Sequence, residues 1–172
     1  MKCLYLLRHA KSCWEESALD DFHRPLNKRG RRAAALMAGY FARRGLRPDV
    51  VLCSAAERTR QTLDALKRVL NGVPVSLEEG LYVASMSALL ERLRRLDGAT
   101  QAVLLIGHNP GIEQLALRLA GIAADRKGLE RMREKYPTAA LAELSASIDR
   151  WDELQAGCCR LEGFTRPADL KA

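Results

Sequence analysis

The chain alternates between short apolar runs and longer stretches in which apolar residues recur every three or four positions. A continuous apolar run of this length is typical of a buried strand, whereas the wider spacing is typical of a helix with one buried face. The runs CLYLL, DVVLCS, VPVSL and AVLLIG therefore predict strands over residues 3–7, 49–54, 73–77 and 102–107.

Helix signals stand between these runs. Asn27 is a good N-cap for a helix that passes through RRAAALMAGYFARR, and Gly45 is placed to end it. The spacing predicts further helices over residues 57–70, 88–96 and 111–121. The alternation of strand and helix predicts an α/β fold, a three-layer sandwich whose mostly parallel central sheet is flanked by helices.

The last third of the chain has a different pattern. Residues 122–138 are polar and charged, and we expect them to form a surface excursion. Residues 139–148 and 158–164 predict two late strands joined near residues 149–157. Because no linker, repeat or low-complexity tract interrupts the pattern, we expect residues 1–172 to form a single domain.

Asn109 and Pro110 follow the strongest apolar run, AVLLIG. They predict a helix whose N-cap is Asn109 and whose first helical residue is the proline.

Composition excludes several classes of protein. The chain is 48% hydrophobic, which is typical of a globular domain rather than a disordered one. No apolar run approaches the roughly 20 residues that cross a bilayer. Arg8 and His9 interrupt the first apolar run too early for a signal peptide. We therefore expect a cytoplasmic protein with no membrane partner.

The formal net charge of +7 raises the possibility of a nucleic-acid partner. The basic residues, however, lie in mixed-sign stretches such as ERLRRLD, and aromatic residues are only 5% of the chain, too few for base-stacking platforms. We expect no nucleic-acid partner. The five cysteines show no C-x-x-C spacing and the three histidines are scattered, so we expect free thiols and no metal site.

Polar residues follow three of the predicted strands, at the point where each strand ends. Arg8 and His9 follow the first strand, Arg58 lies just after the second, and His108 and Asn109 follow AVLLIG. In open α/β sheets, ligands bind beyond the carboxyl ends of the strands, where helix N-termini attract anions. Arginines donate rigid, paired hydrogen bonds, so this set of residues predicts a phosphate site.

Each of these residues also has an ordinary structural interpretation. Arg8 could face solvent, either histidine could be structural, and Arg58 could pair with Glu57 or Asp64 on a helix surface. The functional interpretation rests on the four lying at equivalent points of separate strand–loop–helix units. His23 is expected to be peripheral, and Trp14 either covers the mouth of the pocket or simply packs.

Other phosphate-handling sites are excluded by their motifs. A cysteine-based phosphatase needs C-x5-R, and Cys53 is one residue too close to Arg58. No G-x4-G-K-[ST] loop is present. Neither a G-x-G-x-x-G loop nor a D-x-D follows the first strand.

Four motifs, RHAKS, RPLNKRG, SAAERTRQT and GHNPG, resemble those of the histidine phosphatase (phosphoglycerate-mutase-like) superfamily. In their order and compactness they are most similar to the SixA-type phosphohistidine phosphatases. The resemblance extends from residue 3 to about residue 165. Ala10 stands where the wider superfamily has glycine, and the R-H-A form suits the SixA-type branch.

The resemblance implies a role for each matching residue. His9 would be the nucleophile that forms a phosphohistidine enzyme intermediate, with its other ring nitrogen donating to a backbone carbonyl. Arg8 and Arg58 would clamp the phosphoryl oxygens, and His108 would donate a further hydrogen bond. Asn109 would bind the anion through its backbone amide. No metal or cofactor is expected, because two arginines supply the positive charge.

The general acid and the substrate remain open at this point. Glu78, Glu79, Asp20 and Asp21 are candidate acids, and each could equally be an ordinary surface carboxylate. A missing acid would favour phosphohistidine, because its imidazole leaves readily once protonated. The expected partner is a phosphorylated protein carrying phosphohistidine. The alternatives are a small phosphorylated substrate, such as a sugar phosphate or nucleotide, and a non-catalytic phosphate-binding regulatory module.

Overall fold

Residues 1–15 and 18–171 are described by the structure, a computed structural model. They contain a seven-stranded sheet in the order β3-β2-β4-β1-β6-β7-β5. Only β6 runs antiparallel to its neighbours, so the sheet is mostly parallel, as predicted. The strands are β1 (Lys2–Arg8), β2 (Val50–Ser54), β3 (Val75–Glu78), β4 (Ala102–Gly107), β5 (Ala120–Ala123), β6 (Leu141–Ala146) and β7 (Cys159–Thr165).

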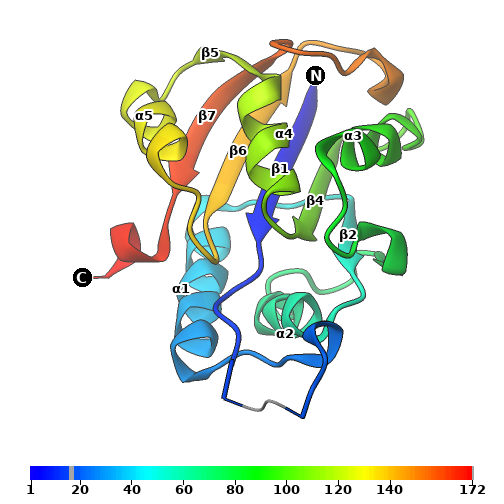
Figure 1. The fold of residues 1–172 in the computed structure, drawn as a ribbon. Helices are drawn as coiled ribbons and strands as arrows, with labels where there is room; N and C mark the ends of the chain where they lie inside the picture. Colours follow the sequence, from blue (N-terminus) through cyan, green and yellow to red (C-terminus); the bar gives the residue numbers. More distant parts are fainter. Residues whose placement is uncertain (16–17, 172) are drawn as a thin grey trace.

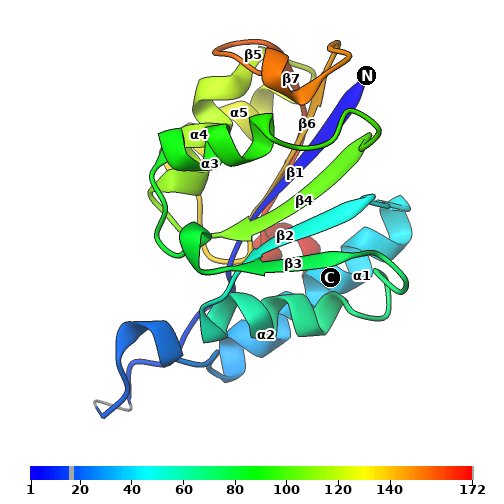
Figure 2. The same ribbon diagram turned by 90° about the vertical axis from the view of Figure 1, so that its right-hand side faces the viewer.

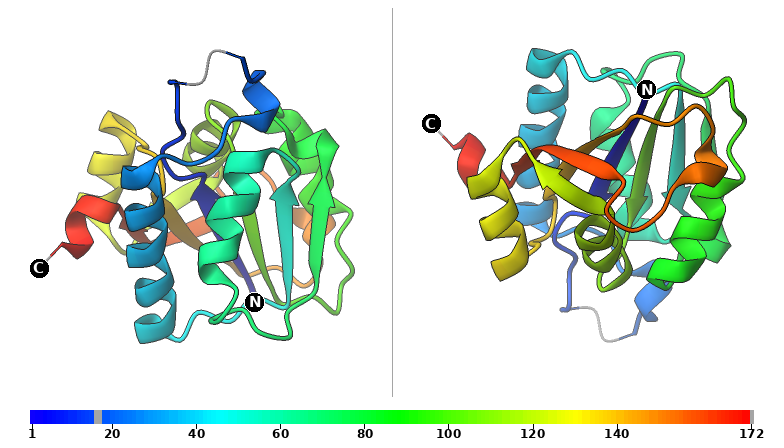
Figure 3. Two further views of the ribbon diagram at one scale, coloured as in Figure 1. Left: turned by 90° about the horizontal axis from the view of Figure 1, so that it is seen from below. Right: turned by 90° about the horizontal axis from the view of Figure 1, so that it is seen from above.

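Helices cover both faces of the sheet, which confirms the three-layer α/β prediction (Figure 2). Two pack side by side on one face and three on the other (Figure 3). The helices are α1 (Lys28–Arg44), α2 (Glu57–Leu66), α3 (Met86–Arg94), α4 (Gly111–Leu119) and α5 (Arg126–Glu134), with short 3-10 turns η1 (Asp21–His23), η2 (Glu79–Leu81), η3 (Trp151–Glu153) and η4 (Pro167–Leu170).

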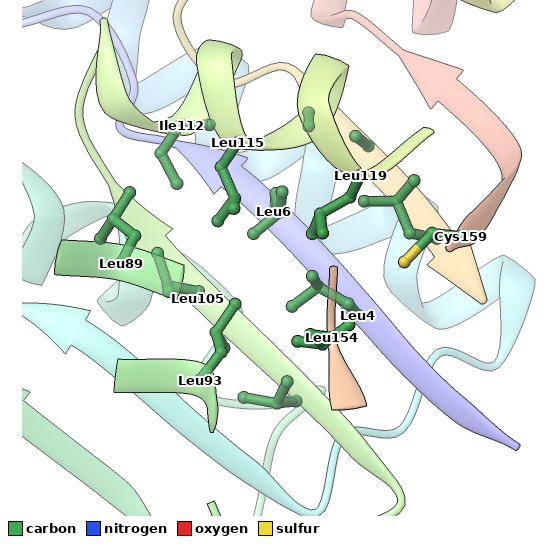
Figure 4. Packing of buried hydrophobic residues seen from close by; sticks show 14 of the residues in the cluster. Leu4, Leu6, Leu89, Leu93, Leu105, Ile112, Leu115, Leu119, Leu154 and Cys159 are labelled. Atoms are coloured by element: carbon green, nitrogen blue, oxygen red, sulfur yellow. The ribbon is translucent and has the colours of Figure 1, made fainter. Parts of the chain in front are cut away.

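Each face of the sheet has its own hydrophobic core. On the α3–α5 face, Leu6 and Leu105 of the central strands pack against Leu89 and Leu115 of the helices (Figure 4). On the other face, Phe41 of α1 belongs to a second buried cluster shared with α2. A fully buried leucine or phenylalanine contributes about 1.5–3 kcal/mol, so these clusters hold the central strands rigidly.

The central strands end at the same level. Arg8 at the end of β1 is paired with Gly107 at the end of β4, and Cys53 of β2 is paired with Ile106. The segments that follow the three strands therefore meet at one edge of the sheet, toward which the arrowheads of β1 and β4 point in Figure 1.

Local signals for the first helix are confirmed. The Asn27 side chain accepts a hydrogen bond from the Gly30 N–H at 2.8 Å, and Gly45 ends α1 with a φ of 63°. Gly30 has a further role, because a Cβ there would lie 2.0 Å from the carbonyl oxygen of Lys11. The glycine of RPLNKRG thus lets the start of α1 approach the loop after β1 closely.

Some predicted boundaries are wrong. The helix expected over residues 57–70 ends at Leu66, and β3 starts two residues later than predicted. The helix expected to reach residue 121 ends at Leu119, where the chain becomes extended and pairs with β7 as β5.

The surface excursion expected over residues 122–138 is also wrong. This segment contains the end of β5 and α5, and it buries Met132 and Tyr136 completely in the core. Its charged residues outnumber the two buried side chains, which is why composition concealed them. No helix among the described residues has the length and hydrophobicity to cross a membrane.

Candidate active site

The ends of β1 and β4 place the two histidines side by side. The His9 N–H donates to the carbonyl of Gly107 at 3.0 Å, so the residue after β1 lies against the end of β4. His108 follows Gly107 directly, and its ring centroid lies 5.2 Å from that of His9, with an angle of 52° between the rings.

His9 is buried and held in one tautomer. Its side-chain Nδ1 lies 2.7 Å from the carbonyl oxygen of Ala10. A carbonyl oxygen can only accept, so Nδ1 carries the proton and Nε2 keeps a free lone pair. This hydrogen bond confirms the expected backbone acceptor. Burial lowers the pKa of His9 to about 3 against the effect of the Ala10 hydrogen bond, and the charges of Arg58 and Arg8 lower it further.

His108 is held from β2. Its Nε2 lies 2.7 Å from the hydroxyl of Ser54, the last residue of that strand. Its Nδ1 is buried with no hydrogen-bond partner among the described residues. Burial lowers the pKa of His108 to about 3, assisted by His9 and by the charge of Arg58, so the ring is neutral at pH 7. Ser54 is not among the site residues predicted from the sequence, although its place at the end of a strand was a usable signal.

Arg8 is oriented by the segment that precedes β6. Its Nη1 donates to the carbonyl oxygen of Tyr136 at 2.8 Å, and its Nε is buried with no partner among the described residues. Tyr136 is itself anchored in the core, where its hydroxyl donates to the carbonyl of Leu6 at 2.6 Å. The segment misread as a surface excursion therefore positions a site residue.

Arg58 is 4% exposed and pairs with Asp21 rather than with Glu57 or Asp64. Its Nη1 donates to the backbone carbonyl of Asp21 at 2.6 Å, and its Nη2 donates to the Asp21 carboxylate at 3.0 Å. Its Nε is buried with no partner among the described residues. The guanidinium therefore joins the site rather than an ion pair on the surface of α2.

Thr62 links α2 to the loop after β1. Its hydroxyl donates to the carbonyl of Arg58 at 2.7 Å and accepts from the Ala10 N–H at 3.0 Å. The second threonine of RTRQT therefore fixes the first turn of α2 against the residue that orients His9.

Asp21 accepts hydrogen bonds from several side chains beside the site and joins them into one network. Besides Arg58, it accepts from Arg24 at 2.8 and 3.1 Å and from the hydroxyl of Tyr82. Although burial raises the pKa of Asp21, the hydrogen bonds from Tyr82 and Arg24 and the charge of Arg58 outweigh it and hold this pKa well below the usual range. The carboxylate is ionised at neutral pH.

The other candidate acids are occupied or exposed. Asp20 pairs with the exposed His23 at 2.6 Å, and this hydrogen bond lowers the pKa of Asp20. Burial raises the pKa of Glu78, but hydrogen bonds from Arg92, at 2.7 to 3.0 Å, and from Ser76 lower it overall. Glu79 is exposed in η2. Asp20, Asp21 and Glu78 are therefore held in the ionised form.

Asn109 departs from its predicted place. Pro110 is the N-cap residue of α4, and the helix begins at Gly111. The Asn109 side chain still accepts from the Glu113 N–H at 3.3 Å, and its Nδ2 donates to the carbonyl of Tyr136 at 3.2 Å. The side chain thus ties the start of α4 to the carbonyl that holds Arg8.

Trp14 is 75% exposed, and the guanidinium of Arg24 lies 3.5 Å from its ring centroid. It therefore stacks at the edge of the Asp21 network.

Three buried nitrogens in this region have no acceptor among the described residues: Arg8 Nε, Arg58 Nε and His108 Nδ1. Leaving such a group buried and unpaired costs about 1–3 kcal/mol, so an oxyanion that accepted from all three would be bound strongly. Within residues 1–15 and 18–171, no three His, Cys, Asp or Glu side chains gather as a metal ion would require.

Comparison with known proteins agrees with these features. A family model described as the histidine phosphatase superfamily (branch 1) matches residues 4–82. An uncharacterized protein of Mycobacterium tuberculosis is 36% identical over 164 residues, which cover 94% of this chain and 99% of the relative.

Two solved structures are also similar. A protein from Agrobacterium tumefaciens, named a putative phosphohistidine phosphatase SixA, is 32% identical with a TM-score of 0.80, over 96% of this chain and 98% of its own. A protein of the same name from Nakamurella multipartitia is 29% identical with a TM-score of 0.82, over 96% of both chains. The chain therefore belongs to the histidine phosphatase superfamily and, within it, to the SixA type of phosphatase.

Proposed function

We propose that this protein removes phosphoryl groups from phosphohistidine on other proteins, with His9 as the nucleophile. One observation carries the proposal. The neutral His9 ring has an unprotonated Nε2, and the same site holds three buried nitrogens, on Arg8, Arg58 and His108, that have no acceptor within the described part of the chain. A nucleophile beside unsatisfied donors is the arrangement that phosphoryl transfer requires.

The reaction has two steps. In the first, the substrate imidazole is already protonated by solvent at its other ring nitrogen; Nε2 of His9 attacks phosphorus, the P–N bond to the substrate breaks, and the substrate ring leaves as neutral imidazole. In the second, water attacks phosphorus on His9, the P–Nε2 bond breaks, and inorganic phosphate leaves. His9 returns to its neutral form, still held through Nδ1 by the Ala10 carbonyl.

The remaining residues bind the phosphoryl group. Arg8 and Arg58 donate through their Nε atoms to non-bridging oxygens, where charge accumulates in the transition state. His108 donates through Nδ1, which requires the Ser54 hydroxyl to donate to Nε2. The backbone amide of Asn109 is proposed as a further donor. The two guanidinium charges serve in place of a metal ion, so activity should persist in a chelator.

The carboxylates favour a phosphohistidine substrate over an alkyl phosphate ester. An alkoxide leaving group needs a protonated acid, whereas Asp20, Asp21 and Glu78 are held ionised by their partners. Imidazole leaves readily once protonated and needs no strong enzymic acid. The names of the two similar solved structures refer to the same substrate class.

The test compares phosphate release from a histidine-phosphorylated protein and from p-nitrophenyl phosphate. We expect the wild type to prefer the phosphoprotein, His9→Ala to be inactive, and His23→Ala, which removes an exposed histidine, to retain activity. Release from the ester alone would favour a small-molecule phosphatase. Release from neither would favour a phosphate-binding module, and normal turnover by His9→Ala would refute the mechanism.

A further inference from the structure

Three apolar side chains lie on segments that border the candidate site, namely the loop after β1, the turn η1 and the turn after η2. Trp14 is 75% exposed and Val83 is 49% exposed, while Phe22 of η1 is half-buried. We call these three residues the apolar rim. Large exposed apolar side chains that gather beside a polar site often mark a binding surface.

Hydrogen bonds and ring contacts connect the apolar rim to the site. The Phe22 ring lies edge-on to Tyr82 with centroids 5.0 Å apart, and the Tyr82 ring lies edge-on to His108 at 5.4 Å. Trp14 stacks on Arg24, which shares Asp21 with Arg58. The rim is therefore continuous with the residues proposed to bind phosphate.

Val83 is held in a strained backbone conformation. Its φ is 48°, in the left-handed region that β-branched residues rarely adopt. Backbone strain of this kind clusters at functional sites. Tyr82 turns toward Asp21 while the next residue, Val83, is exposed, so the strained turn presents an apolar side chain beside the site.

We propose that the apolar rim is the docking surface for a folded protein that carries the phosphohistidine. This inference rests on the proposed function and names the surface that selects its substrate. A histidine side chain is short, so a phosphoryl group held by Arg8 and Arg58 brings the main chain of its carrier close to the rim. Aromatic and apolar side chains in such positions supply most of the affinity in protein interfaces.

Charge complementarity favours this occupant over others. The phosphoryl dianion matches the two guanidinium groups of Arg8 and Arg58, of which the charge of Arg58 is balanced in part by Asp21. The surface of the carrier around its phosphohistidine then covers Trp14, Phe22 and Val83. A small phosphorylated metabolite would occupy the anion site and leave the rim uncovered.

The test uses Val83→Asn, because asparagine tolerates a positive φ and the variant should fold. Val75→Asn is a matched control, since Val75 is 47% exposed but lies at the opposite end of β3. We would measure kcat/KM on a folded protein phosphorylated at a surface histidine and on free phosphohistidine. Trp14→Ala would be measured in the same way.

We expect Val83→Asn and Trp14→Ala to lower kcat/KM on the phosphoprotein about tenfold and to change it less than twofold on free phosphohistidine. Val75→Asn should match the wild type on both substrates. Equal losses on the two substrates, no loss on either, or an equal loss in Val75→Asn would overturn the docking surface alone. A wild type that releases phosphate from neither substrate would overturn the proposed function as well.

Discussion

Replacing Arg58 by alanine tests the anion site where its geometry is best defined. Each Nη of the guanidinium donates one hydrogen bond to Asp21, and the buried Nε–H, which has no partner among the described residues, is available to donate to an anion. A charge-assisted hydrogen bond contributes about 1.5–3 kcal/mol. At 1.4 kcal/mol per tenfold change, Arg58→Ala should weaken the binding of orthovanadate by about 10- to 150-fold.

Isothermal titration calorimetry with orthovanadate measures this effect directly. Arg60→Ala is the matched control, because Arg60 lies on the same helix, two residues along, and is exposed. Its affinity should equal that of the wild type, and thermal unfolding should show that both variants are folded. A dissociation constant for Arg58→Ala within threefold of the wild-type value would remove Arg58 from the anion site.

Three further predictions follow from particular contacts. Ser54→Ala removes the hydrogen-bond partner of His108 Nε2 and leaves that buried atom unpaired, at a cost of about 1–3 kcal/mol. We therefore expect kcat/KM on phosphohistidine to fall about tenfold or more. A kcat/KM within twofold of the wild-type value would contradict this role. Because the pKa values of His9 and His108 are lowered to about 3 in the folded protein, the unfolded chain alone binds their protons as the pH falls below 6.5. The free energy of unfolding in urea should therefore fall by about 2 kcal/mol per histidine between pH 7.5 and pH 5, and a variant with both histidines changed to glutamine should not show this part of the loss. Gly30→Ala should destabilise the protein by about 1–3 kcal/mol, because the added Cβ would meet the backbone of Lys11. Gly39→Ala, in the middle of α1, is the control, because its Cβ would meet only the end of the Arg43 side chain. Equal melting temperatures for the two variants would refute the contact with Lys11.

The residues at the strand ends could be predicted from the sequence because one local pattern and one general property of parallel sheets were enough. Apolar runs mark the strands, and a parallel sheet brings their carboxyl ends together. Arg8, His9, Arg58 and His108 follow from those rules, and the structure brings them to one edge of the sheet. The Asn27 cap and the Gly45 end of α1 are equally local signals.

The contacts that orient these residues could not be predicted in the same way. Ser54 reaches His108 across 54 residues of sequence, Asp21 reaches Arg58 across 37, and Tyr136 reaches Arg8 across 128. No local pattern encodes such pairings, because they depend on strand order. Tyr136 was further concealed by the charged residues around it, which made a core segment look like a surface loop.

The central claim is that His9 carries the phosphoryl group during turnover. The most direct measurement mixes the enzyme with a radiolabelled phosphohistidine protein and stops the reaction rapidly without acid. Peptide mapping then locates the label on the enzyme. The account predicts an acid-labile, base-stable label on the peptide that contains His9, and no label in His9→Ala. A label on His108, or turnover with no labelled enzyme under single-turnover conditions, would contradict it.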